Sequence, residues 1–251
     1  MLAQGMLPPR AVSITFDDGY RDNHDLALPL LKRHGLSATF YVTSGYLNGG
    51  LIFHDVLVET IRHAGTGLLD LGLEGAAALP ISDTASRVNA IQQLMGTVKY
   101  LQPAARQQFS DRLLDTLGAK APRWLMMSDE QVRSMSRQGM GIGGHTTHHV
   151  ILSKLNREHA RDEIVSNRDA LSGLIDKPLT SFAYPNGKPQ TDYDSSHVDL
   201  VREAGYRNAV STLTAVGTKQ ANVHELPRFV LNETTPIGVI LRMLRMTAYS
   251  V

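Results

Sequence analysis

The sequence predicts an α/β fold whose core is a parallel sheet or barrel. Short runs rich in β-branched and aromatic residues alternate along the chain with longer segments whose apolar residues follow helical spacing. In such folds the functional groups gather at the carboxyl ends of the strands. With 251 residues, 42% of them apolar, the chain is long enough to bury the core of one large domain or of two small ones.

The first β-α-β unit is predicted near the start of the chain. Residues 11–16 form a strand that runs into an Asp-Asp-Gly turn, and residues 23–34 form a helix that stops at Gly35. Residues 38–43 form the second strand. Because a helix joins them, these two strands are expected to lie parallel and close together.

The same alternation returns in the second half of the chain. Its predicted segments are a helix at 129–138, an extended piece at 141–144, a helix at 157–173, a strand at 180–184, and three further elements at 198–204, 209–212 and 225–231, the last of them a late strand. Residues 236–249 then form an amphipathic helix that begins at a proline. We expect this helix to dock on the core, since its two arginines make only a weak membrane anchor.

Residues 51–122 have a different character, because their apolar positions between Val88 and Leu117 follow helical spacing. They are predicted to form a helical insertion within a single domain that spans residues 1–251. The insertion either packs on the core for stability or overhangs the strand ends and shapes a substrate cleft.

Composition and charge exclude several classes of function. Lys and Arg number 25 against 24 Asp and Glu, so the net charge of +1 provides no field for nucleic acid or an anionic membrane. The chain has ten His and no Cys, so a metal site must use imidazole and carboxylate ligands. Residues 1–10 lack the apolar run of a signal peptide, and no window resembles a membrane span. We therefore expect a cytoplasmic protein, while the oligomeric state is not indicated.

The first chemical motif is the Asp17-Asp18-Gly19 turn after the first strand. Two adjacent carboxylates repel each other, and a bound metal ion would neutralise one and leave the other as a base. The alternative is an ordinary turn that caps a helix.

The second motif is His145-Thr146-Thr147-His148-His149. If this segment forms a helical turn, His145 and His149, four residues apart, point the same way and can share one ion. His148 then faces elsewhere. Two imidazoles and one carboxylate leave coordination positions open, as catalytic sites require; the alternative is a pair of histidines at the surface or satisfied in the core.

The third motif is Phe182-Ala183-Tyr184-Pro185-Asn186-Gly187, a strand that ends in a tight turn. By itself it indicates only a turn. Its place about thirty residues after the histidine pair makes it a candidate wall of the same site, with a main-chain N–H pointing into the cleft.

Taken in order, these three motifs resemble the polysaccharide deacetylase family, also called the NodB-homology or carbohydrate esterase 4 group. The resemblance covers residues 11–231 apart from the insertion. It implies a distorted (β/α) barrel and a divalent metal, usually zinc, with Co²⁺ or Ni²⁺ as alternatives. It implies that Asp17 is the general base and that Asp18, His145 and His149 are the metal ligands. It also implies that the main-chain N–H of Tyr184 donates to the oxyanion and that Thr146 braces the loop.

Two departures from the family pattern concern catalysis. The family often has an arginine that orients the base carboxylate where this chain has Ala183, and Arg228 is the candidate substitute. The late family motif that supplies the general acid has no clear match, and His224 is the candidate although it is out of register. Relatives with the Phe-Ala-Tyr-Pro form resemble this chain more closely, which places it near the exopolysaccharide and biofilm N-deacetylases.

The resemblance implies hydrolysis of the acetamide of N-acetylhexosamine units in a polysaccharide or its precursor, with release of acetate. The expected partner is therefore an acetylated oligo- or polysaccharide. Two alternatives remain open: a hydrolase of a non-sugar amide or a formamido sugar, and a pseudoenzyme that binds glycans without catalysis.

Overall fold

The computed structural model describes residues 11–71, 77–118 and 124–246. The chain divides into two compact units, one formed by Met1–Gly45 and Met127–Val251 and the other by Tyr46–Met126. The predicted insertion, residues 51–122, falls within the second unit. Its assignment as part of one elaborated domain stays a prediction, as does a role in shaping a substrate cleft.

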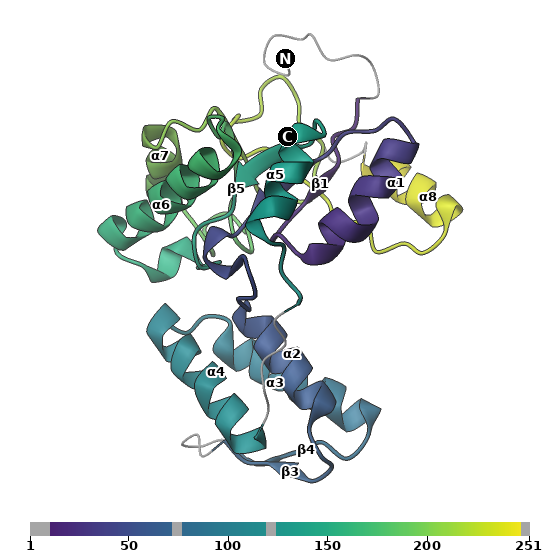
Figure 1. Cartoon of the computed structure of the whole chain (residues 1–251), viewed down its shortest axis with the longest axis vertical. Helices are drawn as coiled ribbons and strands as arrows, with labels where there is room; N and C mark the ends of the chain where they lie inside the picture. Colours follow the sequence, from purple (N-terminus) through teal and green to yellow (C-terminus); the bar gives the residue numbers. More distant parts are fainter. Residues whose placement is uncertain (1–10, 72–76, 119–123, 247–251) are drawn as a thin grey trace. The chain divides into compact units, whose positions relative to one another are not determined.

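The first unit is built on five parallel strands in the order β1-β2-β5-β6-β7 (Figure 1). Their bounds are Thr15–Phe16 for β1, Thr39–Val42 for β2, Gly141–Gly144 for β5, Ser181–Ala183 for β6 and Asn208–Val210 for β7. The strands form a curled half-barrel, so the predicted α/β fold of the distorted barrel type is confirmed.

Helices of this unit follow the strands as the alternation predicts. They are α1 at Leu28–Arg33, preceded by a π-helical turn at Asn23–Ala27, α5 at Asp129–Arg137, α6 at Arg157–Ile175 and α7 at Ser195–Glu203. Both α5 and α6 pack against β5, and α6 lies beside α7. The helices α5 and α7 begin with capping boxes, in which Ser128 and Asp194 accept hydrogen bonds from the first turn.

Of two strands predicted from the sequence, one is shorter in the structure and the other does not form. β1 covers only Thr15–Phe16, because it is an edge strand whose register pairs just those residues with β2. Residues 225–231 form no strand and meet β7 only at a bridge between Val210 and Leu226. Pro227 follows and has no N–H to continue the ladder.

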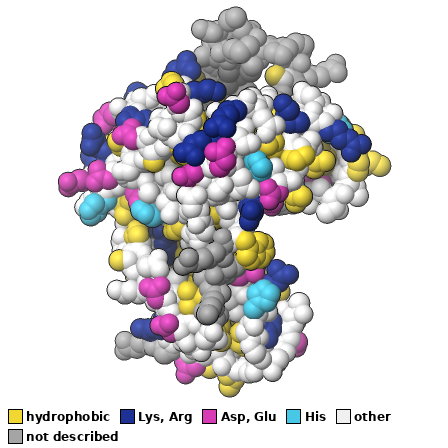
Figure 2. Space-filling view, viewed as in Figure 1, with side chains coloured by type: hydrophobic (Ala, Val, Ile, Leu, Met, Phe, Trp, Pro, Cys, Tyr) yellow, Lys and Arg dark blue, Asp and Glu magenta, His cyan; other side chains and the backbone are white. Residues whose placement is uncertain are grey.

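The C-terminal helix α8 spans Pro236–Met246, and residues 247–249 of the predicted helix lie outside the described part of the chain. It buries Met246, whereas the apolar side chains that we expected to dock are exposed: Ile237, Ile240, Leu241 and Leu244. None of the helices in the described residues combines the length and the apolar character needed to cross a membrane. On the face seen in Figure 2, basic and acidic side chains are interspersed, in keeping with the near-neutral charge.

The second unit has its own helical core. It contains α2 at Phe53–His63, α3 at Thr84–Val98, α4 at Pro103–Leu117 and a small antiparallel pair, β3 at Leu68–Leu69 and β4 at Leu79–Pro80. α2 packs against both α3 and α4. The buried cluster joins side chains from all three helices, among them Leu57, Ile61, Leu94, Val98, Phe109 and Leu113.

Candidate metal centre

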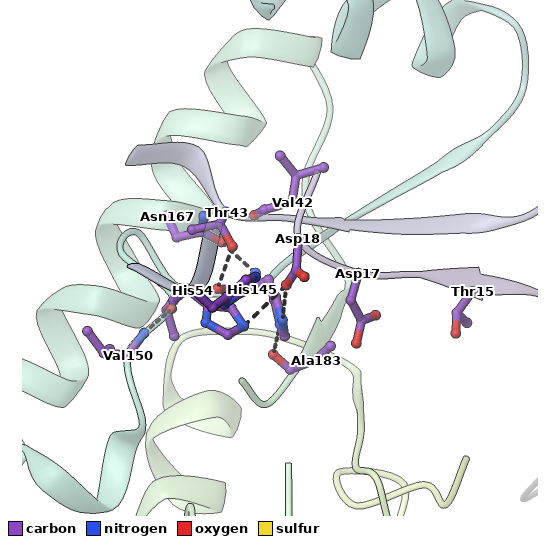
Figure 3. A network of polar contacts seen from close by, with 12 residues as sticks. Thr15, Asp17, Asp18, Val42, Thr43, His54, His145, Val150, Asn167 and Ala183 are labelled. Carbon is purple, nitrogen blue, oxygen red and sulfur yellow. Dashed lines mark hydrogen bonds and ion pairs between the residues drawn. The ribbon is translucent and has the colours of Figure 1, made fainter. Parts of the chain in front are cut away.

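A sharp turn at the end of β1 presents two adjacent carboxylates. Asp18 and Gly19 both have left-handed backbone, with φ of 76° and 92°. For Asp18 this conformation carries a cost, which surrounding contacts must offset. The main-chain N–H of Thr43 donates a hydrogen bond of 3.2 Å to the carbonyl of Asp18 and so fixes this strained residue. The turn places the carboxylate of Asp18 against the imidazole of His145 and leaves the carboxylate of Asp17 apart from it (Figure 3).

The carboxylate of Asp18 faces two imidazoles. Its Oδ1 atom lies 3.3 Å from His145 Nε2 and 3.2 Å from His149 Nε2. One ligand atom from each of the three residues lies within 4.8 Å of the others. Both histidines are buried, while about a fifth of the Asp18 side chain, 21%, is exposed. These donor types and this convergence suit a divalent transition metal.

The segment that carries the histidines is a loop after β5 and not the helical turn that the spacing suggested. Thr146 and His149 have left-handed backbone, with φ of 59° and 48°. These two reversals bring the imidazoles of His145 and His149 together, with ring centroids 5.0 Å apart. The Thr146 hydroxyl accepts a hydrogen bond from the N–H of Val150, as a brace within the loop should.

A hydrogen bond on the far side of the His145 ring supports metal binding. His145 Nδ1 lies 2.7 Å from the carbonyl oxygen of Ala183, at the end of β6. A carbonyl can only accept, so Nδ1 carries the proton and donates it. In the neutral ring, Nε2 is then left with its lone pair on the side of Asp18, the arrangement found at histidine ligands of metals. The three residues therefore fit a metal ion.

Electrostatic coupling within the cluster is strong. Burial by itself raises the pKa of Asp18, but the hydrogen bonds and charges of His145 and His149 outweigh it, and the net pKa lies well below the ordinary value. For His145, burial favours the neutral ring, yet Asp18 and Asp17 together raise its pKa above the ordinary value. A metal cation bound here would replace the extra proton of a charged imidazole ring, because it too would balance the negative charge of the carboxylates.

The second carboxylate, Asp17, is held by Arg228. The Arg228 Nη1 atom lies 2.7 Å from Asp17 Oδ1, and Nη2 lies 2.8 Å from Oδ2. Further bonds from the guanidinium reach the hydroxyl of Thr15 and the carbonyl of Ser211, both at 3.1 Å. Burial opposes ionisation of Asp17, but the charge of His145 and the pairing with Arg228 hold its pKa below the ordinary value.

Two other predicted site residues have hydrogen bonds that compete with their expected roles. The N–H of Tyr184 donates to the carbonyl of Val210 at 3.2 Å, and its hydroxyl donates to the carbonyl of His224 at 3.0 Å. The ring of His224 is buried, with Nε2 3.0 Å from the carbonyl of Tyr206. The roles of oxyanion donor and general acid therefore stay predictions.

His148 faces away from the cluster, although the segment is not the helical turn on which that expectation rested. It is 55% exposed, and its Nδ1 lies 2.7 Å from Glu163 on α6.

The sequence did not reveal the residues that hydrogen-bond the main chain of the ligand loops, chiefly Thr43 and Asn167. Threonine at a strand end and asparagine on a helix are common, and their partners here are mostly main-chain atoms, so no sequence signal marks them.

The parallel half-barrel and the cluster at its strand ends define the class as an α/β protein with a candidate metal centre. Residues 4–209 match the polysaccharide deacetylase family, and the chain belongs to it. The Bacillus subtilis (strain 168) protein YxkH, provisionally named a polysaccharide deacetylase, is 20% identical over 229 residues. That alignment covers 91% of this chain but only 54% of YxkH, so the chain spans about half the length of this relative.

Solved structures of other proteins have a fold similar to that of this chain. The Streptococcus pyogenes deacetylase PplD, solved in complex with acetate, superposes with a TM-score of 0.60 at 19% identity, over 96% of this chain and 74% of PplD. IcaB from Ammonifex degensii superposes with a TM-score of 0.59 at 17% identity, over 98% of this chain and 78% of IcaB. At these identities the likeness concerns the fold alone.

Proposed function

We propose that this chain is a metal-dependent N-deacetylase that hydrolyses the acetamide of N-acetylhexosamine units in a polysaccharide or its precursor. The observation that carries the proposal is that the two adjacent carboxylates, Asp17 and Asp18, have different partners. Asp18 faces the two imidazoles, whereas Asp17 stays outside that set and is paired with Arg228. A hydrolase needs such a separate base, and a purely structural metal site does not.

The metal that we propose is Zn²⁺, with Co²⁺ or Ni²⁺ as alternatives that the same donors accept. Asp18, His145 and His149 hold it, and with three protein ligands coordination positions stay open. When bound, the ion supplies Lewis-acid polarisation of the acetamide carbonyl and lowers the pKa of a water molecule.

The residues of the chain carry the proton transfers. Asp17 accepts a proton from the attacking water, and Arg228 keeps both carboxylate oxygens in place while it does so. Hydrolysis consumes one water, breaks the C–N bond and releases acetate and a free amine. The leaving nitrogen must receive a proton, for which His224 is the candidate, and Tyr184 is the candidate donor to the developing oxyanion.

Release of the free amine and of the carboxylate product, acetate from acetamides and formate from the formamido sugar, tests the proposal across a substrate panel. The panel contains N-acetylglucosamine oligomers, a formamido sugar and a simple non-sugar amide, each with the protein stripped of metal and then restored with Zn²⁺. We expect acetate from the oligomers only in the restored sample. Turnover of the formamido sugar or the amide alone would assign a different hydrolase, and oligomer binding without acetate release would indicate a pseudoenzyme.

A further inference from the structure

Thr43, one residue beyond β2, contacts both of the loops that carry the predicted ligands. Its N–H donates to the carbonyl of Asp18 at 3.2 Å, and its hydroxyl donates to the carbonyl of His145 at 3.3 Å. The side chain is fully buried. A single threonine thus joins the turn after β1 to the loop after β5, directly behind the cluster (Figure 3).

Asn167 of α6 lies next to Thr43 and contacts the same region (Figure 3). Its Oδ1 accepts a hydrogen bond of 3.0 Å from the N–H of His145. Its amide nitrogen donates to the carbonyl of Val42 at 3.1 Å and to the hydroxyl of Ser44 at 2.9 Å, the two residues that flank Thr43. Asn167 is fully buried as well.

The two residues together enclose the main chain of one ligand. The main-chain N–H of His145 donates to Asn167, and its carbonyl accepts from Thr43. Both main-chain polar groups of this residue are therefore hydrogen-bonded by side chains. The approach is close, because a Cβ at Gly144 would lie 2.7 Å from Asn167 Oδ1. Glycine at that position is what allows the asparagine to reach the loop.

We propose that Thr43 and Asn167 are positioning residues that set the distance between Asp18 and His145 for metal binding. The inference rests on the proposed metal-dependent function. Asp18 has a left-handed backbone that costs free energy, and such a conformation persists only when its surroundings hold it. Thr43 supplies that hold and links it to His145, so the ligand spacing is set before a metal arrives.

Direct measurement of Co²⁺ binding tests this inference without any assay of activity. Thr43→Val keeps the volume and the N–H but removes the hydroxyl, and Thr43→Ser restores the hydroxyl. Thr60→Val is the matched control, because Thr60 is also buried but belongs to α2 in the second unit. Affinity is measured by competition with a chelator, ligand geometry by the visible spectrum of bound Co²⁺, and folding by circular dichroism of the metal-free protein.

We expect Thr43→Val to bind Co²⁺ at least about tenfold more weakly, with an altered spectrum, while its metal-free form stays folded. Thr43→Ser and Thr60→Val are expected to bind like the unaltered chain. Asn167→Ala, which removes the hydrogen bond to the N–H of His145, is a second variant in case Thr43→Val does not fold, and it too should weaken binding.

Two results would overturn the inference, and they are distinguishable. If the unaltered chain binds Co²⁺ and both Thr43→Val and Asn167→Ala bind it with the same affinity and spectrum, the positioning role is wrong and the metal site stands. If the unaltered chain takes up no Co²⁺, the proposed metal site itself is wrong, and the inference falls with it.

Discussion

Arg228 and Asp17 form a bidentate ion pair, with N–O distances of 2.7 and 2.8 Å, across a separation of 211 residues. The side chains are 16% and 31% exposed, so water screens the pair only in part. In the family pattern an arginine at the position of Ala183 often orients the base, and here Ala183 is fully buried. We propose that Arg228 performs that task from a different part of the chain.

Replacing Arg228 should move the pH dependence of deacetylation. Arg228 helps to hold the pKa of Asp17 below its ordinary value, so Arg228→Ala raises that pKa. The base is then protonated up to a higher pH, and the acid limb of the rate profile shifts upward. Arg228→Lys should rescue only part of the shift, because lysine cannot make the bidentate contact. Arg202→Ala, at an exposed arginine, is the control; an unmoved acid limb in Arg228→Ala would rule out the role.

Asp17→Asn should separate catalysis from metal binding. The amide keeps the shape of the side chain but cannot accept a proton, and Asp17 is not among the three predicted ligands. We expect a loss of turnover of at least about 10²-fold. Metal content, measured by elemental analysis of the same sample, should stay at the level of the unaltered chain. A rate close to normal would remove Asp17 as the base.

Substitution of either ligand histidine should abolish metal binding. His145→Ala and His149→Ala each remove one of the converging Nε2 atoms. His148→Ala is the matched control, since this neighbouring histidine faces Glu163 and is half exposed. Elemental analysis should find metal in His148→Ala and little in the other two. Full occupancy in His145→Ala would contradict the ligand assignment.

Stability of the metal-free protein should show the coupling of Asp18 to His145. The pKa of Asp18 in the folded protein is lowered from 3.8. Its contribution to the free energy of unfolding is therefore fully present above pH 3.8 and is lost as the pH falls through the folded-state pKa. The pKa of His145 in the folded protein is raised from 6.5. Its contribution to the free energy of unfolding is therefore fully present below pH 6.5 and is lost as the pH rises through the folded-state pKa.

The difference in free energy of unfolding between the unaltered chain and Asp18→Asn, both with chelator, measures this coupling. It should be largest between pH 3.8 and 6.5 and should shrink on both sides. Urea unfolding at a series of pH values gives the difference directly. A difference that does not vary with pH would show that the pair is not ionised in the folded protein.

Much of the architecture could be predicted because its signals are local. A strand that ends in Asp-Asp-Gly, an alternation of strands and helices, and helical spacing in residues 84–117 are all patterns over short stretches. The strand expected at residues 225–231 was wrong for a similar local reason, because Pro227 cannot continue a ladder that the apolar pattern suggested.

The candidate site divides in the same way. The sequence by itself determined the chemical types, since the absence of Cys left carboxylate and imidazole as the donors for a metal. The resemblance to the polysaccharide deacetylase family then singled out Asp18, His145 and His149 as the expected ligand set. It did not determine how His145 and His149 meet. The expected helical turn is replaced by a loop with left-handed residues, whose conformation is held by contacts to other elements.

Only the tertiary structure decided which distant residues support the site. Arg228 was a candidate partner of Asp17 in the sequence, but the pair exists because the segment that carries Arg228 lies beside the end of β7, and from there its side chain reaches Asp17 at the end of β1. Thr43 and Asn167 carried no signal, because their hydrogen bonds go mainly to main-chain atoms, which every residue possesses. The sequence determines which chemical groups the side chains carry, whereas the packing of strands and helices determines which main-chain atoms those groups meet.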